Sequence, residues 1–189
     1  MDCIRNRVCA DIEKRLTPKR LRHTYAVADE AVKLAEIYGE DREKAELAAL
    51  FHDMFRCEPA EHLNQLVEDF RLPERLKDKV NLSHGKVAAE SMKRDYRIKD
   101  VDMVNAVAFH TTGRAGMSRL EKIIYLADAI EPGRSYPTVE ETRKLAYDDL
   151  DAACINSLTR TIEYIEGEGG YLDPDTVNAL MDLKEKRNL

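Results

Sequence analysis

Glycine and proline are scarce in this chain, with 8 Gly and 6 Pro among 189 residues. They are spread along the chain, mostly as helix stops, and the sequence contains no linker, internal repeat or low-complexity segment. Apolar residues make up 43% of the chain and charged residues 35%. This balance is typical of a soluble protein built from helices with one charged face, and the length suits one domain of about 100–200 residues. We therefore expect residues 1–189 to form a single domain.

Long apolar runs are also lacking. No segment approaches the ~20 apolar residues of a membrane-spanning helix. The first seven residues contain no apolar run of signal-peptide length. We therefore expect a cytoplasmic protein without a membrane partner.

Positive charge is not in excess, because 36 acidic and 30 basic side chains give a net charge of −6. A molecule of this charge repels polyanions as a whole, so no nucleic-acid partner is expected. A small anionic substrate remains compatible with the sequence if basic residues cluster locally.

Cysteine is too sparse to form a disulfide framework. The chain has four, Cys3, Cys9, Cys57 and Cys154, and none of them belongs to a C-x-x-C pair. Free thiols are therefore expected in preference to a structural zinc site.

Helical patterns dominate the sequence. Apolar residues recur every four positions from Ile4 to Leu16, which predicts an amphipathic helix that ends before Pro18. Thr17 and Gly39 predict the start and the end of a second helix. The further helices are predicted at 41–55, 59–70, 83–96, 101–111, 118–130, 139–146, 149–166 and 174–186. No segment alternates like a strand, so we expect an all-α bundle of about ten helices.

A few His and Asp residues lie in apolar runs. His52, Asp53 and Asp128 stand within such runs, and His110 ends another. A buried carboxylate normally pairs, binds a metal or becomes neutral, because an isolated buried charge is costly. Imidazole and carboxylate ligands suit divalent Zn, Fe, Mn, Co or Ni. His23, on the second helix, could complete such a site, since facing helices commonly build metal sites.

A hydrogen-bonded core histidine is the alternative for His23 and for His110, because most buried polar groups are simply satisfied within the core. His62 has no apolar surroundings in the sequence. We expect it on a solvated face.

The pattern His23…His52-Asp53…Asp128 resembles the H…HD…D signature of the HD superfamily of metal-dependent phosphohydrolases. Three longer strings, at 82–85, 108–113 and 122–134, are similar to those of the bacterial YqeK group, the symmetrical diadenosine tetraphosphate hydrolases.

The similarity to this group spans about Pro18 to Pro174. The chain departs from the group's pattern at Leu180-Met181, where an Arg-Asn pair is expected. This departure puts a substrate contact from the last helix in question.

The resemblance implies a divalent-metal enzyme that hydrolyses a dinucleoside polyphosphate, diadenosine tetraphosphate, to two ADP. Iron is the implied metal, with Mn, Co or Zn as alternatives. The implied metal ligands are His23, His52, Asp53 and Asp128, and Asp53 also has an implied catalytic role. Without the ion, repulsion between the two carboxylates should drive one of them toward the protonated form.

Two further histidines, His84 and His110, lie outside the four-ligand set. The resemblance assigns them to catalysis, through substrate phosphate binding or water orientation, or to a second metal. His84 is expected just inside a helix N-terminus after Ser83, where backbone N–H groups favour phosphate.

Other candidate substrate-binding residues are Lys19, Arg56, Arg134 and Tyr171. Arg56, three residues after Asp53, would share its helix face. Arg134 could bind phosphate through two parallel hydrogen bonds.

Other functions stay open, because a metal site alone does not choose the leaving group. The alternatives are an HD nucleotidase, a deoxynucleotide triphosphohydrolase or an alarmone hydrolase acting on another nucleotide. A non-catalytic nucleotide sensor fits less well, since a degenerate sensor should have lost a ligand. A homodimer is compatible with the sequence.

Overall fold

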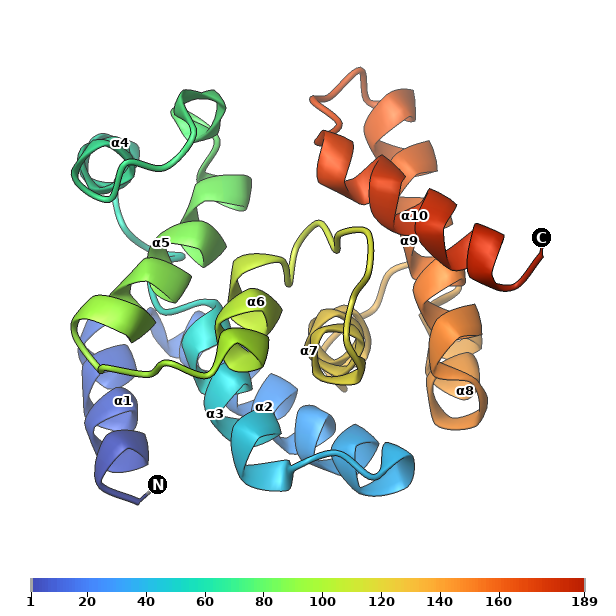
Figure 1. Cartoon of the computed structure of the whole chain (residues 1–189), viewed down its shortest axis with the longest axis horizontal. Coiled ribbons are helices and arrows are strands. Elements are labelled where there is room, and N and C mark those ends of the chain that lie inside the picture. Colours follow the sequence, from blue (N-terminus) through green and yellow to red (C-terminus); the bar gives the residue numbers. More distant parts are fainter. Residues whose placement is uncertain (1, 189) are drawn as a thin grey trace.

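The computed structural model describes residues 2–188, and every regular element within that range is helical (Figure 1). The elements are α1 (Asp2–Arg15), α2 (Pro18–Tyr38), α3 (Arg42–His52), α4 (Ala60–Asp69), the 3₁₀-helix η1 (Glu74–Leu76), α5 (Val80–Arg94), α6 (Val101–Ala108), α7 (Arg119–Ile130), α8 (Val139–Asp148), α9 (Leu150–Gly167) and α10 (Pro174–Lys186). The predicted all-α fold of about ten helices is confirmed. In this range no helix has the length and apolar character needed to cross a membrane.

Several helix ends follow from local sequence. The Thr17 hydroxyl accepts a hydrogen bond from a backbone N–H in the first turn of α2, and Pro18 occupies the first helical position. Gly39, at φ 67°, adopts the left-handed conformation that ends this helix. Ser118 and Glu121 form a capping box at the start of α7.

Helix α7 lies in the middle of the molecule. It packs against α2, α3, α6, α8 and α9, and Figure 1 shows it nearly end-on between the N-terminal helices and α8 to α10. Its side chains Ile123, Ile124 and Leu126 are fully buried. Because α2 carries His23 and α7 carries Asp128, the packing of these two helices brings both residues to one place.

The third helix ends earlier than predicted. It stops at His52, and Asp53 has φ −106° and ψ 12°, outside the helical range. Met54 and Phe55 are buried although they lie in turns. The apolar run that led to a predicted helix end at residue 55 therefore reflects burial and not helical structure. Arg56 is therefore not on a helix face shared with Asp53. Its N–H instead closes a turn on the Asp53 carbonyl at 2.8 Å.

The predicted position of His84 is also wrong. Helix α5 begins three residues before the predicted start, without a side-chain cap at Lys79, so Ser83 is buried inside the helix. His84 lies in its second turn, and the phosphate-binding role expected from a helix N-terminus has no basis there. Helix α6 ends at Ala108, and His110 lies in the turn that follows.

Candidate metal centre

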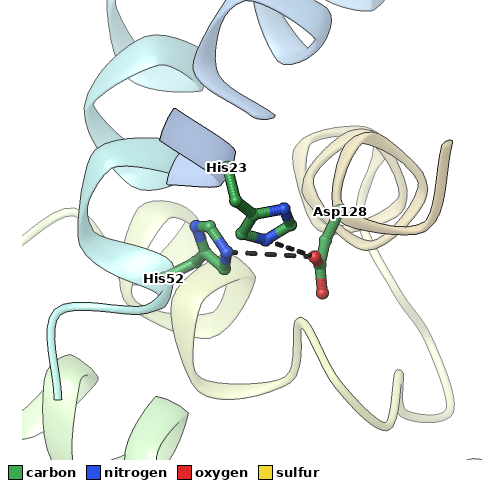
Figure 2. Close-up of side chains that lie close together, drawn as sticks. All are labelled: His23, His52 and Asp128. Carbon is green, nitrogen blue, oxygen red and sulfur yellow. Dashed lines mark ion pairs between the residues drawn. The ribbon is translucent and has the colours of Figure 1, made fainter. Parts of the chain in front are cut away.

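Six polar side chains converge where α2, α3, α5, α6 and α7 meet. They are His23 on α2, His52 at the end of α3, Asp53 directly after it, His84 on α5, His110 after α6 and Asp128 on α7. Figure 2 shows three of them, His23, His52 and Asp128, turned toward one another. Helices distant in the sequence thus supply one cluster, and it contains all four predicted metal ligands.

The predicted ligands lie close to each other. His23 Nε2 is 3.0 Å from Asp128 Oδ1 and 3.5 Å from Asp53 Oδ2. His52 Nε2 is 3.3 Å from Asp53 Oδ2 and 3.9 Å from Asp128 Oδ1. His52 is completely buried, whereas the Asp128 side chain keeps 21% of its surface exposed. The cluster is therefore reachable from solvent on the Asp128 side.

Asp53 also faces the other two histidines. Its Oδ1 lies 3.1 Å from His84 Nε2, while its Oδ2 faces His23 and His52. His84 Nε2 is in turn 3.1 Å from His110 Nε2. One carboxylate therefore stands between two groups of imidazoles, an arrangement that could hold one ion or two.

Three of the four histidine rings are oriented by the same kind of hydrogen bond. In each, Nδ1 lies within hydrogen-bonding distance of a backbone carbonyl three or four residues earlier: 2.6 Å for His52 and Ala49, 2.7 Å for His84 and Val80, and 2.8 Å for His110 and Val107. Nδ1 must be the donor, because a carbonyl oxygen can only accept. In the neutral rings Nε2 is then unprotonated and aimed at the centre, as in metal-binding histidines.

Glu131 holds the fourth ring. Its Oε1 lies 3.1 Å from His23 Nδ1, and its Oε2 accepts a 2.5 Å hydrogen bond from the Gly133 backbone N–H. A Cβ at Gly133 would stand 2.9 Å from Oε2, so the turn after α7 needs glycine to let this carboxylate approach. The sequence-based prediction missed Glu131, although it lies within the matched string at 122–134.

The centre contains two unsatisfied atoms. His23 Nε2 and His52 Nε2 are buried and have no hydrogen-bond partner among residues 2–188. Although His23 Nε2 is 3.0 Å from Asp128 Oδ1, two atoms that both bear lone pairs repel unless a proton or a cation lies between them. Orphaned imidazole nitrogens next to carboxylates fit a divalent ion, because these are the ligands such ions take.

The directions of the pKa shifts favour the ionised form of both carboxylates in the centre. Burial opposes ionisation of Asp53, but His52 and His84 hold the pKa of that carboxyl well below its usual range. Burial likewise opposes the charge of Asp128, yet His23, His52 and Arg134 keep its pKa low. The expectation that one carboxylate becomes protonated without the ion is therefore wrong. The basic side chains around the two carboxylates offset their mutual repulsion.

For His110, burial determines the direction of the pKa shift. It lowers the pKa of this imidazole to about 3, helped by the nearby His84 and His52. His52 differs, since Asp53 and Asp128 raise its pKa against the effect of burial.

Two arginines contact the carboxylates. Arg20 Nη1 is 2.8 Å from Asp53 Oδ2. Arg134 binds Asp128 twice, through Nη2 to the carboxylate and through Nε to the backbone oxygen at 2.8 Å. Arg134 was predicted to bind substrate, and its ion pair with Asp128 was not foreseen. Arg20 was missed, although it lies one turn before His23 on α2.

Two cavities flank the centre. The first cavity, of about 770 Å³, is lined by His23 and by Lys19, a predicted substrate-binding residue. The second cavity, of about 760 Å³, is lined by Asp53 and by Tyr171, another such residue. Arg56 lines both, and its Nη2 donates to Asn81 Oδ1 at 2.6 Å. The predicted substrate residues thus surround the centre on two sides.

His62 lies outside the site, as the sequence predicts. The His62 side chain is 49% exposed, and its Nδ1 lies 2.8 Å from Glu58 Oε2. The four cysteines are free. Met181, at the departure from the group's pattern, is 64% exposed on α10, and neither it nor Leu180 lines either cavity.

Comparison with known proteins gives consistent results. Residues 20–133 match the HD domain model. The chain is 40% identical to the symmetrical bis(5'-nucleosyl)-tetraphosphatase of Bacillus subtilis, over 91% of this chain and 93% of that protein, and 37% identical to the Staphylococcus aureus protein of the same name, over 81% and 80%. A crystal structure from Clostridium acetobutylicum, described as an HD superfamily hydrolase involved in NAD metabolism, is 39% identical, with a TM-score of 0.91 over 96% of this chain and 97% of that one. The chain belongs to the HD domain family.

Proposed function

We propose that this protein is a metal-dependent symmetrical bis(5'-nucleosyl)-tetraphosphatase that hydrolyses diadenosine tetraphosphate to two ADP. The observation that carries the proposal is the convergence of four imidazole Nε2 atoms and two carboxylates at the border of two arginine-lined cavities. The names of the relatives from Bacillus subtilis and Staphylococcus aureus support the substrate class.

The metal ligands in this proposal are His23, His52, Asp53 and Asp128. A divalent ion supplies Lewis-acid chemistry, because it lowers the pKa of water toward neutrality and polarises a phosphoryl oxygen. We propose iron, since imidazole and carboxylate ligands suit it, with Mn, Co and Zn as the alternatives for metal analysis.

The chain's own residues would orient the reactants. Arg20 and Arg134 pair with the carboxylates of Asp53 and Asp128 and would fix their direction, as ligands require. Arg56 has no ion pair among residues 2–188 and lines both cavities, so its guanidinium is available for phosphate. Lys19 would add charge at the rim of the first cavity.

His84 and His110 would complete the site. Their Nε2 atoms face Asp53 from the second cavity, where they could orient water, bind a phosphate oxygen or hold a second ion. Catalysis is thus assigned to Asp53, His84 and His110. Counting bound metal per chain distinguishes the second ion from the other two roles.

The second cavity draws residues from outside the matched range 20–133. Thr161, Tyr164 and Tyr171 lie on or after α9 and line the cavity together with Asp53. We therefore propose that the chain acts as one functional unit, with α9 and the following loop completing the substrate site.

Product analysis tests the proposed reaction. Hydrolysis at the central anhydride adds the oxygen of water to one central phosphorus, and the bridging oxygen leaves with the other ADP. Chromatography after incubation with diadenosine tetraphosphate and Fe, Mn or Zn should show ADP alone. AMP with ATP, or no turnover with any metal, would refute the proposal.

The cellular location and the oligomeric state of the protein are also part of the proposal. We propose a cytoplasmic enzyme and test a homodimer by light scattering of the purified protein. A mass near twice the 21.6 kDa of the chain would support the dimer, and a mass near 21.6 kDa would exclude it.

A further inference from the structure

The two cavities meet at the metal centre. Arg20, Arg56 and Arg134 line both of them. His23 lines only the first cavity, whereas Asp53 and Asp128 line only the second. The candidate metal ligands therefore stand at the boundary, with open space of similar size on either side.

The first cavity is strongly cationic although the protein carries a net charge of −6. Its charged lining residues are Lys19, Arg20, Arg22, Arg56, Arg134 and one acid, Glu131. Glu131 is already engaged with His23 and Gly133. Lys19 and Arg22 form no ion pair or side-chain hydrogen bond with any of residues 2–188. Unpaired cations around a cavity favour a polyanionic ligand such as a diphosphate.

Aromatic side chains complete both cavities. Tyr136 is half-buried in the wall of the first cavity. Tyr164 and Tyr171, 70% and 48% exposed, line the second cavity. A tyrosine ring is a surface on which a nucleobase stacks, and each cavity volume lies within the range of about 300–1,000 Å³ usual for small-molecule sites. Each cavity thus combines groups for phosphate with a group for a base.

Building on the proposed hydrolysis of diadenosine tetraphosphate, we propose that the first cavity is a second nucleoside diphosphate subsite, with Arg22 binding phosphate and Tyr136 the base. The substrate then spans both cavities, and its middle lies at the metal centre. Symmetrical cleavage follows from this placement, because the anhydride held between two equivalent halves is the central one.

ADP binding to the metal-loaded protein tests the second subsite. Calorimetry should give two ADP per chain for the wild type. Arg22→Ala should weaken one of the two sites about tenfold, the effect of losing roughly 1.4 kcal/mol, a modest value for one charge-assisted contact. Arg119→Ala is the matched control, since Arg119 is exposed, unpaired among residues 2–188 and lines neither cavity.

A natural thiol reports where the ADP binds. Cys57 is exposed in the lining of the first cavity and absent from that of the second, whereas Cys3 is exposed on α1. ADP should slow alkylation of Cys57 by N-ethylmaleimide, read by peptide mass spectrometry, and leave Cys3 unchanged. In Arg22→Ala the same ADP concentration should protect Cys57 less.

Either of two outcomes would overturn the subsite: one ADP per chain in the wild type, or two ADP with Cys57 unprotected, which would mean that the second nucleotide binds elsewhere. Equal ADP affinities in Arg22→Ala and Arg119→Ala would remove Arg22 from the site. These readouts need no turnover, so they are independent of product analysis, which alone decides the proposed reaction.

Discussion

Glu131 Oε1 lies 3.1 Å from His23 Nδ1, which ties the turn after α7 to this candidate ligand histidine on α2 across 108 positions of sequence. The same turn places Arg134 on the Asp128 carboxylate. One short segment therefore positions two candidate metal ligands, His23 from one side and Asp128 from the other. Partners of this kind fix the ring tautomer and raise the basicity of the ligand.

Replacing this carboxylate should weaken metal binding. Glu131→Gln keeps the side chain's size but removes its charge, so we expect metal affinity to fall about 10–100-fold. Equilibrium dialysis with metal analysis measures the effect directly. Glu185→Gln, an exposed position on α10, is the matched control and should bind metal like the wild type. Equal affinity in both variants would contradict a positioning role for Glu131.

Gly85 should tolerate no side chain, because it lets α5 approach the ring of His110. An added Cβ would stand 2.8 Å from His110 Cε1 and 3.0 Å from the Val107 backbone oxygen. Gly85→Ala should therefore cost about 1–3 kcal/mol of stability, or roughly 2–12 °C in Tm, and lower activity by displacing His110. In contrast, Gly167→Ala meets nothing within 4 Å and serves as the control in thermal unfolding. Similar Tm values for both variants would show that the contact is easily relieved.

Arg56, at the border of the two cavities, should affect substrate binding or turnover rather than metal binding. Among residues 2–188 the Arg56 side chain hydrogen-bonds only with Asn81, so Arg56→Ala should retain the ion yet raise KM or lower kcat for diadenosine tetraphosphate about tenfold. Arg134→Ala should in addition weaken metal binding, because Arg134 pairs with the Asp128 carboxylate, so metal content distinguishes the two variants. A variant with normal metal and normal kinetics would exclude that arginine from the phosphate site.

Removing the metal should destabilise the wild type more than Asp128→Asn. A ligand at 100-fold excess over its Kd stabilises by about 2.7 kcal/mol, so a chelator should lower the wild-type Tm by roughly 5–10 °C. The shift should shrink in Asp128→Asn, which lacks one ligand. An equal shift in both proteins would mean that Asp128 does not bind the ion.

Comparing wild type and Asp128→Asn without metal shows which effect on stability is larger, the repulsion between Asp53 and Asp128 or the ion pair between Asp128 and Arg134. Because Arg134 pairs with Asp128, metal-free Asp128→Asn should be less stable than metal-free wild type by about 1–2 kcal/mol. Thermal unfolding of the two chelated proteins measures this difference. A more stable variant would show that repulsion between Asp53 and Asp128 outweighs the ion pair.

The sequence predicts elements whose signals are local. Thr17, Pro18 and Gly39 determine the ends of α2 through hydrogen bonds and backbone angles of the segment itself. The position of His84 was missed because α5 starts without a side-chain cap, and Ser83, a plausible cap by type, lies inside the helix. The end of α3 was missed because the residues after His52 stay buried without being helical.

The ligand pattern was predictable, but its partners were not. Arg20 reaches Asp53 across 33 positions, and Glu131 reaches His23 across 108, so no local pattern links these pairs. Their contacts follow from the packing of helices, which the order of residues does not display. The charge of the two carboxylates was likewise misjudged, since it depends on side chains that separate helices bring together, among them His52, His84 and Arg134.

Metal reconstitution with parallel measurement of bound metal and ADP tests the central claim most directly. The chelated wild type and His62→Ala should be inactive and should regain ADP formation in proportion to the Fe or Mn that they bind. Asp53→Ala should bind almost no metal and form almost no ADP, because the change removes a buried ligand shared by both groups of histidines. Full ADP formation by the chelated wild type, or by Asp53→Ala, would contradict the account.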